Sequence, residues 1–207
     1  MTFLSAAGAV PCPFRHHSAV GAVIFDLDGT LLDTEPMHRL AFRRTLLRLG
    51  FRTPDDLHDR LVGIATPDRI GLLRAHFGQA FPVQSFLVEY RRQKRRVQSA
   101  GIELKRGALE LLGWLDQQQI SSAVVTSASR NTATTCLAQT GLLQRFAVVI
   151  TRDDVAHRKP HPEPFLLAAG ALGVLPGTCR SLEDSTPASI PHMRRECSRS
   201  SYRTLRF

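Results

Sequence analysis

The sequence lacks long hydrophobic runs. No stretch of its 207 residues approaches the eighteen or so consecutive apolar residues of a membrane span, and its apolar (43%) and charged (22%) contents are those of an ordinary soluble protein. We therefore expect a soluble chain with no membrane partner. The opening segment Met1–Val10 also lacks the basic leader and cleavage site of a signal peptide. We interpret residues 1–20 as an N-terminal tail and expect a cytoplasmic protein.

Cysteine pairs are lacking as well. The scattered cysteines form no CxxC pair, which argues against both a zinc site and a disulfide framework and favours a reducing compartment. They are Cys12, Cys136, Cys179 and Cys197. Internal repeats and low-complexity tracts are absent too. A chain of this length buries one sizeable core with at most a small inserted domain.

Negative charge is in the minority, because 27 Lys and Arg face 18 Asp and Glu, a formal charge of +9. The excess lies in two clusters, which attract polyanions without specificity. Neither comes with an aromatic-interleaved or helix-turn-helix signature, so we interpret them as a solvated helix face and a basic tail and expect no specific nucleic-acid partner. The clusters are Arg91, Arg92, Lys94, Arg95 and Arg96, and Arg194, Arg195, Arg199, Arg203 and Arg206.

The most informative segment that is present is an apolar run ending in two aspartates. Val23 to Phe25 have the character of a strand buried on both faces, and Asp26 follows at its carboxyl end, where open α/β sheets bind ligands. Asp26 and Asp28 leave a strand toward the same side, so both can face one electrophile or one divalent cation. An Asp-Gly turn without chemistry explains the same pattern, and the run alone does not exclude it.

The order of helices and strands predicts the fold class. Segment 37–104 shows helical periodicity over 37–49, 66–77 and 83–98 and no strand. Helices (107–119, 131–140, 164–172) then alternate with strands (122–125, 147–150, 180–182). Alternation predicts parallel strands with right-handed crossovers, so we expect an α/β protein with a doubly wound, Rossmann-like parallel sheet core and an inserted α-helical domain. The expected parts are a tail (1–20), the core (21–36 and 105–190), the helical insert (37–104) and a basic C-terminal tail (191–207).

Three more polar stations follow other predicted strands. Thr126 and Ser127 can hold a phosphate oxygen or simply cap a helix, two readings of equal weight. Lys159, in a proline-pinned loop, could neutralise a phosphate and a carboxylate, although a lone lysine is usually only solvated. Glu183 and Asp184 suit Mg²⁺ or, alternatively, a helix N-terminus. Their common placement at strand ends is the strong signal.

In this order the four stations resemble the four motifs of the haloacid dehalogenase superfamily over about residues 21–186. The segment Asp26–Glu35 and the pair Glu183-Asp184 look like its β-phosphoglucomutase and phosphoglycolate phosphatase branch. The resemblance implies that Asp26 is the nucleophile and forms an aspartyl-phosphate, and that Asp28 is the acid and base. It also implies that Lys159 screens the charge of Asp26 and the phosphate, and that Thr126 or Ser127 binds the phosphoryl oxygens.

The resemblance further implies a Mg²⁺ site, formed by Asp26, Asp28, Asp184 and Glu183, the last either a ligand or just behind one. The helical insert matches the family's mobile cap, and its candidate specificity positions are His38, Gly63 and Thr66. In mutases of the family a basic residue of the cap loop engages a second phosphate. In the corresponding loop here, no cation stands before Arg69, because the positions are Val62, Ile64, Thr66 and Pro67. This departure favours hydrolysis of a monophosphate.

The sequence departs from the family pattern after Asp184. Ala188 stands in place of a glycine, and residues 192–207 are rich in Arg and Ser without an apolar strand. We therefore expect the last strand of the sheet to be missing and its neighbour uncovered.

The function predicted from the sequence is a magnesium-dependent phosphatase of a small phosphorylated metabolite, such as a sugar phosphate, acting as a monomer or weak dimer. The alternatives are a phosphomutase of the β-phosphoglucomutase type and, from a different class, an inactive, truncated relative or a binding protein that uses its basic surfaces.

Overall fold

A computed structural model describes residues 20–62, 64, 66–184 and 194–197. Its centre is a parallel sheet in the order β3-β2-β1-β4-β5. The strands are β1 (Ala22–Phe25), β2 (Ser121–Val125), β3 (Val148–Ile150), β4 (Cys179–Glu183) and β5 (Arg194–Cys197). Successive strands lead outward from β1 to β3, and the chain then crosses to β4 on the other side of β1. This reversal creates the switch point at which open α/β sheets bind ligands.

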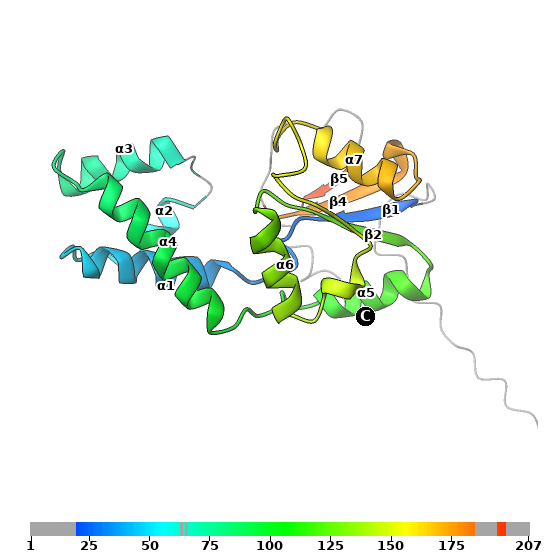
Figure 1. Cartoon of the computed structure of the whole chain (residues 1–207), viewed down its shortest axis with the longest axis horizontal. Helices are drawn as coiled ribbons and strands as arrows, with labels where there is room; N and C mark the ends of the chain where they lie inside the picture. The colour runs from blue at the N-terminus through cyan, green and yellow to red at the C-terminus, as the bar shows by residue number, and fades with distance from the viewer. Residues whose placement is uncertain (1–19, 63, 65, 185–193, 198–207) are drawn as a thin grey trace, which may run out of the picture.

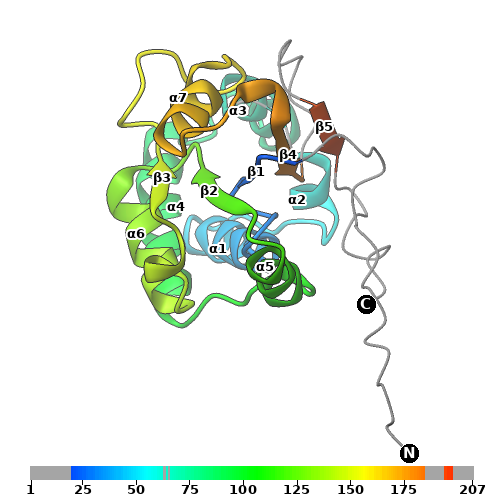
Figure 2. The ribbon, with the colours of Figure 1, turned by 90° about the vertical axis from the view of Figure 1, so that its right-hand side faces the viewer.

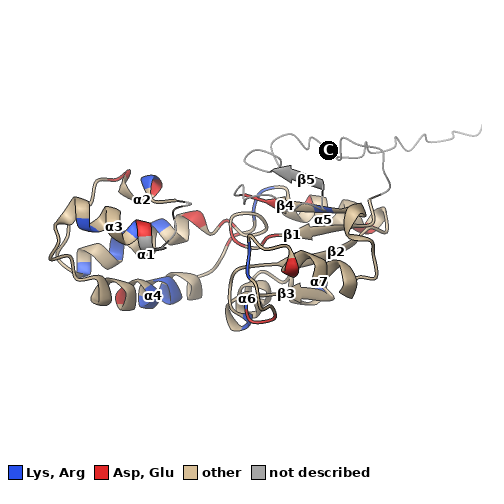
Figure 3. Ribbon diagram, turned by 90° about the horizontal axis from the view of Figure 1, so that it is seen from above, with Lys and Arg blue, Asp and Glu red and all other residues tan. Residues whose placement is uncertain are grey.

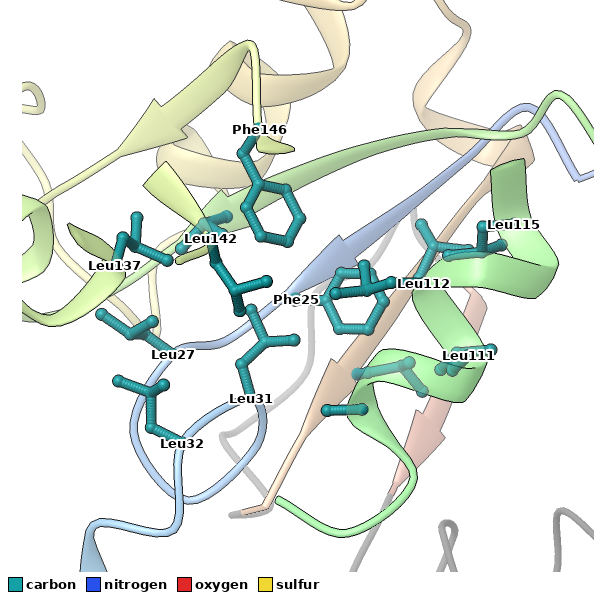
Figure 4. Close-up of a cluster of buried hydrophobic side chains, with 14 of the residues drawn as sticks. Phe25, Leu27, Leu31, Leu32, Leu111, Leu112, Leu115, Leu137, Leu142 and Phe146 are labelled. Atoms are coloured by element: carbon teal, nitrogen blue, oxygen red, sulfur yellow. The ribbon is translucent and has the colours of Figure 1, made fainter. Parts of the chain in front are cut away.

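Helices cover both faces of the sheet because its central strands are apolar on both sides. On one face Val23 and Phe25 pack against α5 (Ala108–Gln117) and α6 (Arg130–Gln139), and Figure 4 shows the leucines around Phe25. On the other face Ala22 and Ile24 pack against α7 (Glu163–Ala171). Figures 1 and 2 show α7 and α5 on opposite sides of the strands. Two short 3₁₀ helices, η1 (Leu143–Arg145) and η2 (Pro176–Thr178), complete this part. The α/β sheet predicted from the sequence is confirmed.

The segment between β1 and α5 forms a separate helical layer beside the sheet (Figure 1). It consists of α1 (Glu35–Arg48), α2 (Leu57–Arg60), α3 (Thr66–Phe77) and α4 (Val83–Ser99), of which α2 was not predicted. These helices enclose their own apolar cluster, centred on Phe42, Leu46 and Phe86. Within the described ranges, no helix is long and apolar enough to cross a membrane.

The two connections between the helical layer and the sheet run side by side. The amide of Asp33 donates to the carbonyl of Glu103 (2.9 Å), and that of Lys105 donates to the carbonyl of Leu31 (2.8 Å). The Lys105 ammonium also contacts Asp33 Oδ1 at 2.8 Å. The helical layer thus joins the sheet through one paired double linker.

The prediction that the sheet lacks its last strand is wrong. Arg194–Cys197 forms β5 and pairs in parallel with β4, with Leu182 opposite Glu196. Strand pairing uses backbone groups, so a polar segment can add to the sheet although it shows no apolar pattern. Consequently β4 is not an edge strand, and all five of its residues are buried.

Candidate active site

The polar stations of the sequence meet at the carboxyl edge of the sheet. Asp26 directly follows β1, Thr126 follows β2, and Glu183 ends β4. The backbone fixes their alignment, because the Asp26 amide donates to the Leu182 carbonyl (2.9 Å) and the Thr126 amide to the Ile150 carbonyl (2.9 Å). Lys159 lies in the loop between β3 and α7. These side chains line one cavity of about 800 Å³ between the sheet and the helical layer, together with Asp28, Ser127 and Asp184.

A buried ion triad forms the floor of the cavity. The Lys159 ammonium lies 2.8 Å from Asp26 Oδ1 and 2.9 Å from Glu183 Oε1. The ammonium also lies 5.0 Å from the ring centre of Phe165, a cation–π contact. The three charged side chains are each at most 16% exposed. Water screens such charges poorly, so the position of Lys159 is strongly fixed by its two carboxylates.

Burial sets the protonation of the triad. It raises the pKa of Asp26 from 3.8 to about 6, although Lys159 pulls it down, and the charges of Asp28 and Glu183 raise it further. Burial alone would lower the pKa of Lys159, but Asp26 and Glu183 raise it above its usual value. Lys159 is therefore a permanent cation, whereas the charged form of Asp26 is disfavoured mainly by its burial.

Asp28 faces the helical layer. His38 Nε2, on α1, lies 4.0 Å from Asp28 Oδ1, and the phenol oxygen of Tyr90 lies 3.5 Å from His38 Nδ1. Burial alone would raise the pKa of Asp28, but hydrogen bonding to His38 and the charges of His38 and Lys94 lower it below its usual value. The two aspartates of the motif therefore have opposite pKa shifts, which is typical of carboxylates with different chemical roles.

Gly29 allows Asp184 to approach the two aspartates. A Cβ atom built on Gly29 would lie 2.1 Å from Asp184 Oδ2, and Gly29 has φ +75°. A side chain at this position would displace the Asp184 carboxylate and strain the backbone, so glycine is favoured. Asp184 is thereby held against the loop that carries Asp28.

The hydroxyl residues that follow β2, Thr126 and Ser127, line the same cavity. Thr126 is buried, and its Oγ1 accepts a hydrogen bond from the Ala128 amide at 3.0 Å, whereas Ser127 is exposed to the cavity. The residue that caps α6 is Ser129 rather than Thr126 or Ser127, because the Ser129 side chain accepts a hydrogen bond from the Thr132 amide at the start of that helix. This leaves the side chain of Ser127 available to a ligand.

The donor set of the cavity fits a magnesium ion. Asp26, Asp28 and Asp184 offer hard carboxylate oxygens on one side of the cavity, and Mg²⁺ prefers a few such ligands together with waters and a substrate phosphate. Burial raises the pKa of Asp26 and so disfavours its charged form, and a divalent cation bound beside it would favour that form. Glu183, by contrast, directs its Oε1 to Lys159.

The helical layer contributes cations that the sequence did not reveal. Lys94 was interpreted as part of a solvated helix face, and Figure 3 shows Lys and Arg along α4. The structure corrects this for Lys94, which is half-buried and lines the cavity with Arg69, while Arg91, Arg92, Arg95 and Arg96 are exposed. Burial lowers the pKa of Lys94 and the charge of Asp28 opposes this shift.

His38, a candidate specificity position in the sequence, lines the cavity. The two other candidate specificity positions stay predictions. Gly63 lies outside the described residues, and only the backbone of Thr66, at the start of α3, is described. His58 and Tyr90 line the cavity and had no signal in the sequence. Their positions depend on how the helices pack around Phe42, which contacts both rings.

Comparison with known proteins gives the same classification as the geometry. Residues 23–189 match the family model of haloacid dehalogenase-like hydrolases. The chain is 32% identical to the phosphorylated carbohydrates phosphatase of Thermotoga maritima, covering 79% of this chain and 76% of the relative. It is 33% identical to the fructose-1-phosphate phosphatase YqaB of Escherichia coli, covering 79% and 86% of the two chains.

Solved structures agree. CbbY of Rhodobacter sphaeroides, crystallised with xylulose-(1,5)bisphosphate, is 28% identical and superimposes with a TM-score of 0.60 over 80% of this chain and 78% of that one. A HAD-superfamily hydrolase of Geobacter sulfurreducens is 25% identical, with a TM-score of 0.62 over 83% and 81% of the chains. Sequence motifs, sheet topology and matched length agree, and this chain belongs to the haloacid dehalogenase-like hydrolases.

Proposed function

We propose that this chain is a magnesium-dependent phosphatase that hydrolyses a small phosphorylated metabolite, a sugar phosphate in particular, through an aspartyl-phosphate on Asp26. The observation that carries the proposal is the Lys159 ammonium between Asp26 and Glu183, with Asp28 and Asp184 in the same cavity. The substrate class is supported by two relatives, one named for phosphorylated carbohydrates and one for fructose 1-phosphate.

In the first half of the reaction, a carboxylate oxygen of Asp26 attacks phosphorus, and the bond to the leaving oxygen breaks. Asp28 donates its proton to that oxygen, so the alcohol departs neutral. The incoming phosphate dianion raises the pKa of Asp28, which counters the lowering by His38 and lets Asp28 carry this proton.

In the second half, Asp28 takes a proton from a water molecule, and this water attacks phosphorus. The bond to Asp26 breaks, which releases inorganic phosphate and restores the carboxylate. The two aspartates alternate in these steps, so each must stay in its own place.

The remaining side chains bind and neutralise the phosphate. Lys159 offsets the repulsion between Asp26 and the phosphate, and Ser127, with Thr126 behind it, donates to phosphoryl oxygens. Asp26, Asp28 and Asp184 would hold Mg²⁺, which when bound supplies further positive charge to the phosphoryl group. The helical layer covers the cavity and restricts entry of bulk water.

The test is phosphate release from p-nitrophenyl phosphate and a panel of sugar phosphates, with Mg²⁺ and with EDTA. We expect Mg²⁺-dependent release that Asp26→Asn abolishes. Asp55→Asn is the matched control, because its side chain is 92% exposed on the helical layer and away from the cavity. No release from any compound by a folded, Mg²⁺-loaded protein would refute the proposal.

A phosphomutase is the second candidate, and the structure adds an observation in its favour. The sequence argument against it was the lack of a cap cation before Arg69, yet Arg69 and Lys94 both line the cavity and could engage a second phosphate. Conversion of β-glucose 1-phosphate to glucose 6-phosphate without net phosphate release would favour the mutase. Stoichiometric release of phosphate from the same compound would favour the phosphatase.

A further inference from the structure

A second group of potential metal ligands lies on the loop that carries Lys159. A nitrogen of His157, a nitrogen of His161 and a carboxylate oxygen of Glu163 all lie within 4.8 Å of one another. His157 Nδ1 is 2.7 Å and His161 Nδ1 is 3.9 Å from Glu163 Oε2. The two imidazole rings have centroids 4.6 Å apart and an interplanar angle of 33°. None of these residues lines the cavity of the active site.

These separations are close to those around a bound metal. Zinc bonds of about 2.0–2.2 Å to nitrogen and oxygen place neighbouring tetrahedral ligands about 3.4 Å apart. The two measured distances to Glu163, 2.7 and 3.9 Å, lie on either side of this value. Binding would change the positions of the two exposed histidines and would replace the hydrogen bond that His161 Nδ1 accepts from the Glu163 amide (3.2 Å).

The carboxylate is oriented before any metal binds. Glu163 Oε1 accepts a hydrogen bond from the Ala156 amide (2.8 Å), and Oε2 accepts one from the His157 amide (2.9 Å). Hydrogen bonds of this kind hold metal-ligating carboxylates in place and strengthen metal binding. Pro160, between the two histidines, and Pro162, between His161 and Glu163, restrict the backbone of this loop.

We propose that His157, His161 and Glu163 bind a borderline transition-metal ion such as Zn²⁺, separate from the Mg²⁺ of the active site. Two imidazoles and one carboxylate suit Zn²⁺, Ni²⁺ or Cu²⁺, whereas Mg²⁺ prefers oxygen ligands alone. The side chains of His157 and His161 are 67% and 49% exposed, so an ion can enter directly from solvent and keep water as its remaining ligands.

The site gives the protein two metal centres of different chemistry. Lys159 lies between the two histidines in the sequence and contacts Asp26 and Glu183 in the active-site cavity, which neither histidine lines. A metal bound by the three residues would link residues 157 and 163 and so restrain the loop that carries the active-site ammonium. A structural hydrogen-bond cluster is the competing interpretation, and it requires no metal at all.

The experiment is equilibrium dialysis of Zn²⁺ against the full chain, purified without a polyhistidine tag, in saturating Mg²⁺. The variant is His157→Ala with His161→Ala, whose exposed side chains are removed without opening the core. The matched control is His76→Ala, an exposed histidine on α3. The wild type and the control should bind one more Zn²⁺ than the double variant. This difference is informative even if other histidines, such as His16 and His17, also bind.

A second measurement identifies the ligands. Cu²⁺ bound at this site should show nitrogen hyperfine coupling from two imidazoles in its electron paramagnetic resonance spectrum, and the double variant should lose it. Glu163→Gln should weaken Zn²⁺ binding on the order of tenfold or more. Equal Zn²⁺ stoichiometry in the wild type and the double variant, or no Zn²⁺ on either, would leave only the hydrogen-bond cluster and overturn the proposal.

Discussion

Replacement of Asp26 by asparagine should stabilise the metal-free protein while it abolishes activity. Burial raises the pKa of Asp26 from 3.8 to about 6, so keeping it ionised in the folded state at neutral pH costs about 3 kcal/mol, because one pH unit is worth about 1.4 kcal/mol. The Asn side chain has a similar shape and no charge. Lys159 keeps Glu183 as its partner at 2.9 Å. For a chain of this size the gain corresponds to about 6–12 °C in Tm.

The effect has a defined pH dependence. An acid whose folded-state pKa is raised does not affect stability below its unfolded value of 3.8 and destabilises fully above its folded value of about 6. The Tm difference between Asp26→Asn and the wild type should therefore be small near pH 4 and maximal at pH 7.5. Thermal melts in EDTA at these two pH values measure it, with Asp55→Asn as the control.

Addition of Mg²⁺ should reduce the Tm difference between Asp26→Asn and the wild type, because the ion binds the wild-type carboxylate more tightly than the amide and so stabilises the wild type more. An Asp26→Asn variant that melts at or below the wild type at pH 7.5 in EDTA would refute the reasoning. The Asp26 carboxylate would then be adequately solvated or paired, and its charge would not oppose folding.

Three further predictions concern other parts of the molecule. Gly29→Ala should lower Tm and weaken Mg²⁺ binding, because the new Cβ would lie 2.1 Å from Asp184 Oδ2 and residue 29 has φ +75°. A calorimetric titration in which the variant binds Mg²⁺ as the wild type does would contradict this prediction. Lys94→Met should raise KM for phosphorylated sugars about tenfold, because one charge-assisted contact is lost, and should change kcat less. An unchanged KM in steady-state kinetics would mean that Lys94 does not contact the substrate. Burial would raise the pKa of Asp154, but hydrogen bonds to Arg130 and Thr151 outweigh it and hold this pKa at about 2. Asp154→Asn should therefore lower the free energy of unfolding by about 1 kcal/mol after allowance for solvent screening. This cost should be complete above pH 4 and vanish as the pH falls toward 2, as denaturant unfolding at several pH values can test.

The core of the site was predictable because it depends on local sequence and on one topological rule. A run of apolar residues predicts a buried strand, and in a parallel sheet the carboxyl ends of all strands lie at the same edge of the sheet. The sequence alone therefore predicts that Asp26, Thr126 and Glu183 lie together. Lys159 was predictable for the same reason, since its loop follows β3.

Two features were not predictable, for different physical reasons. Lys94 shares its helix with exposed arginines, and only the packing of α4 against α1 determines that it faces the cavity while Arg95 does not. The strand β5 has no apolar β pattern in its sequence, and its place in the sheet follows from backbone pairing with β4. Periodicity detects neither kind of determinant.

The paired double linker has a consequence for the evolution and engineering of this protein. The backbones of Asp33 and Glu103 are hydrogen-bonded to each other at the two ends of the helical layer. An insert whose ends meet in this way can be exchanged for another insert, or for a short turn, without a break in the strand order of the sheet. The site of chemistry and the unit that covers it are thus modular, and a chimera that carries a relative's helices between these two residues would keep the aspartates in register.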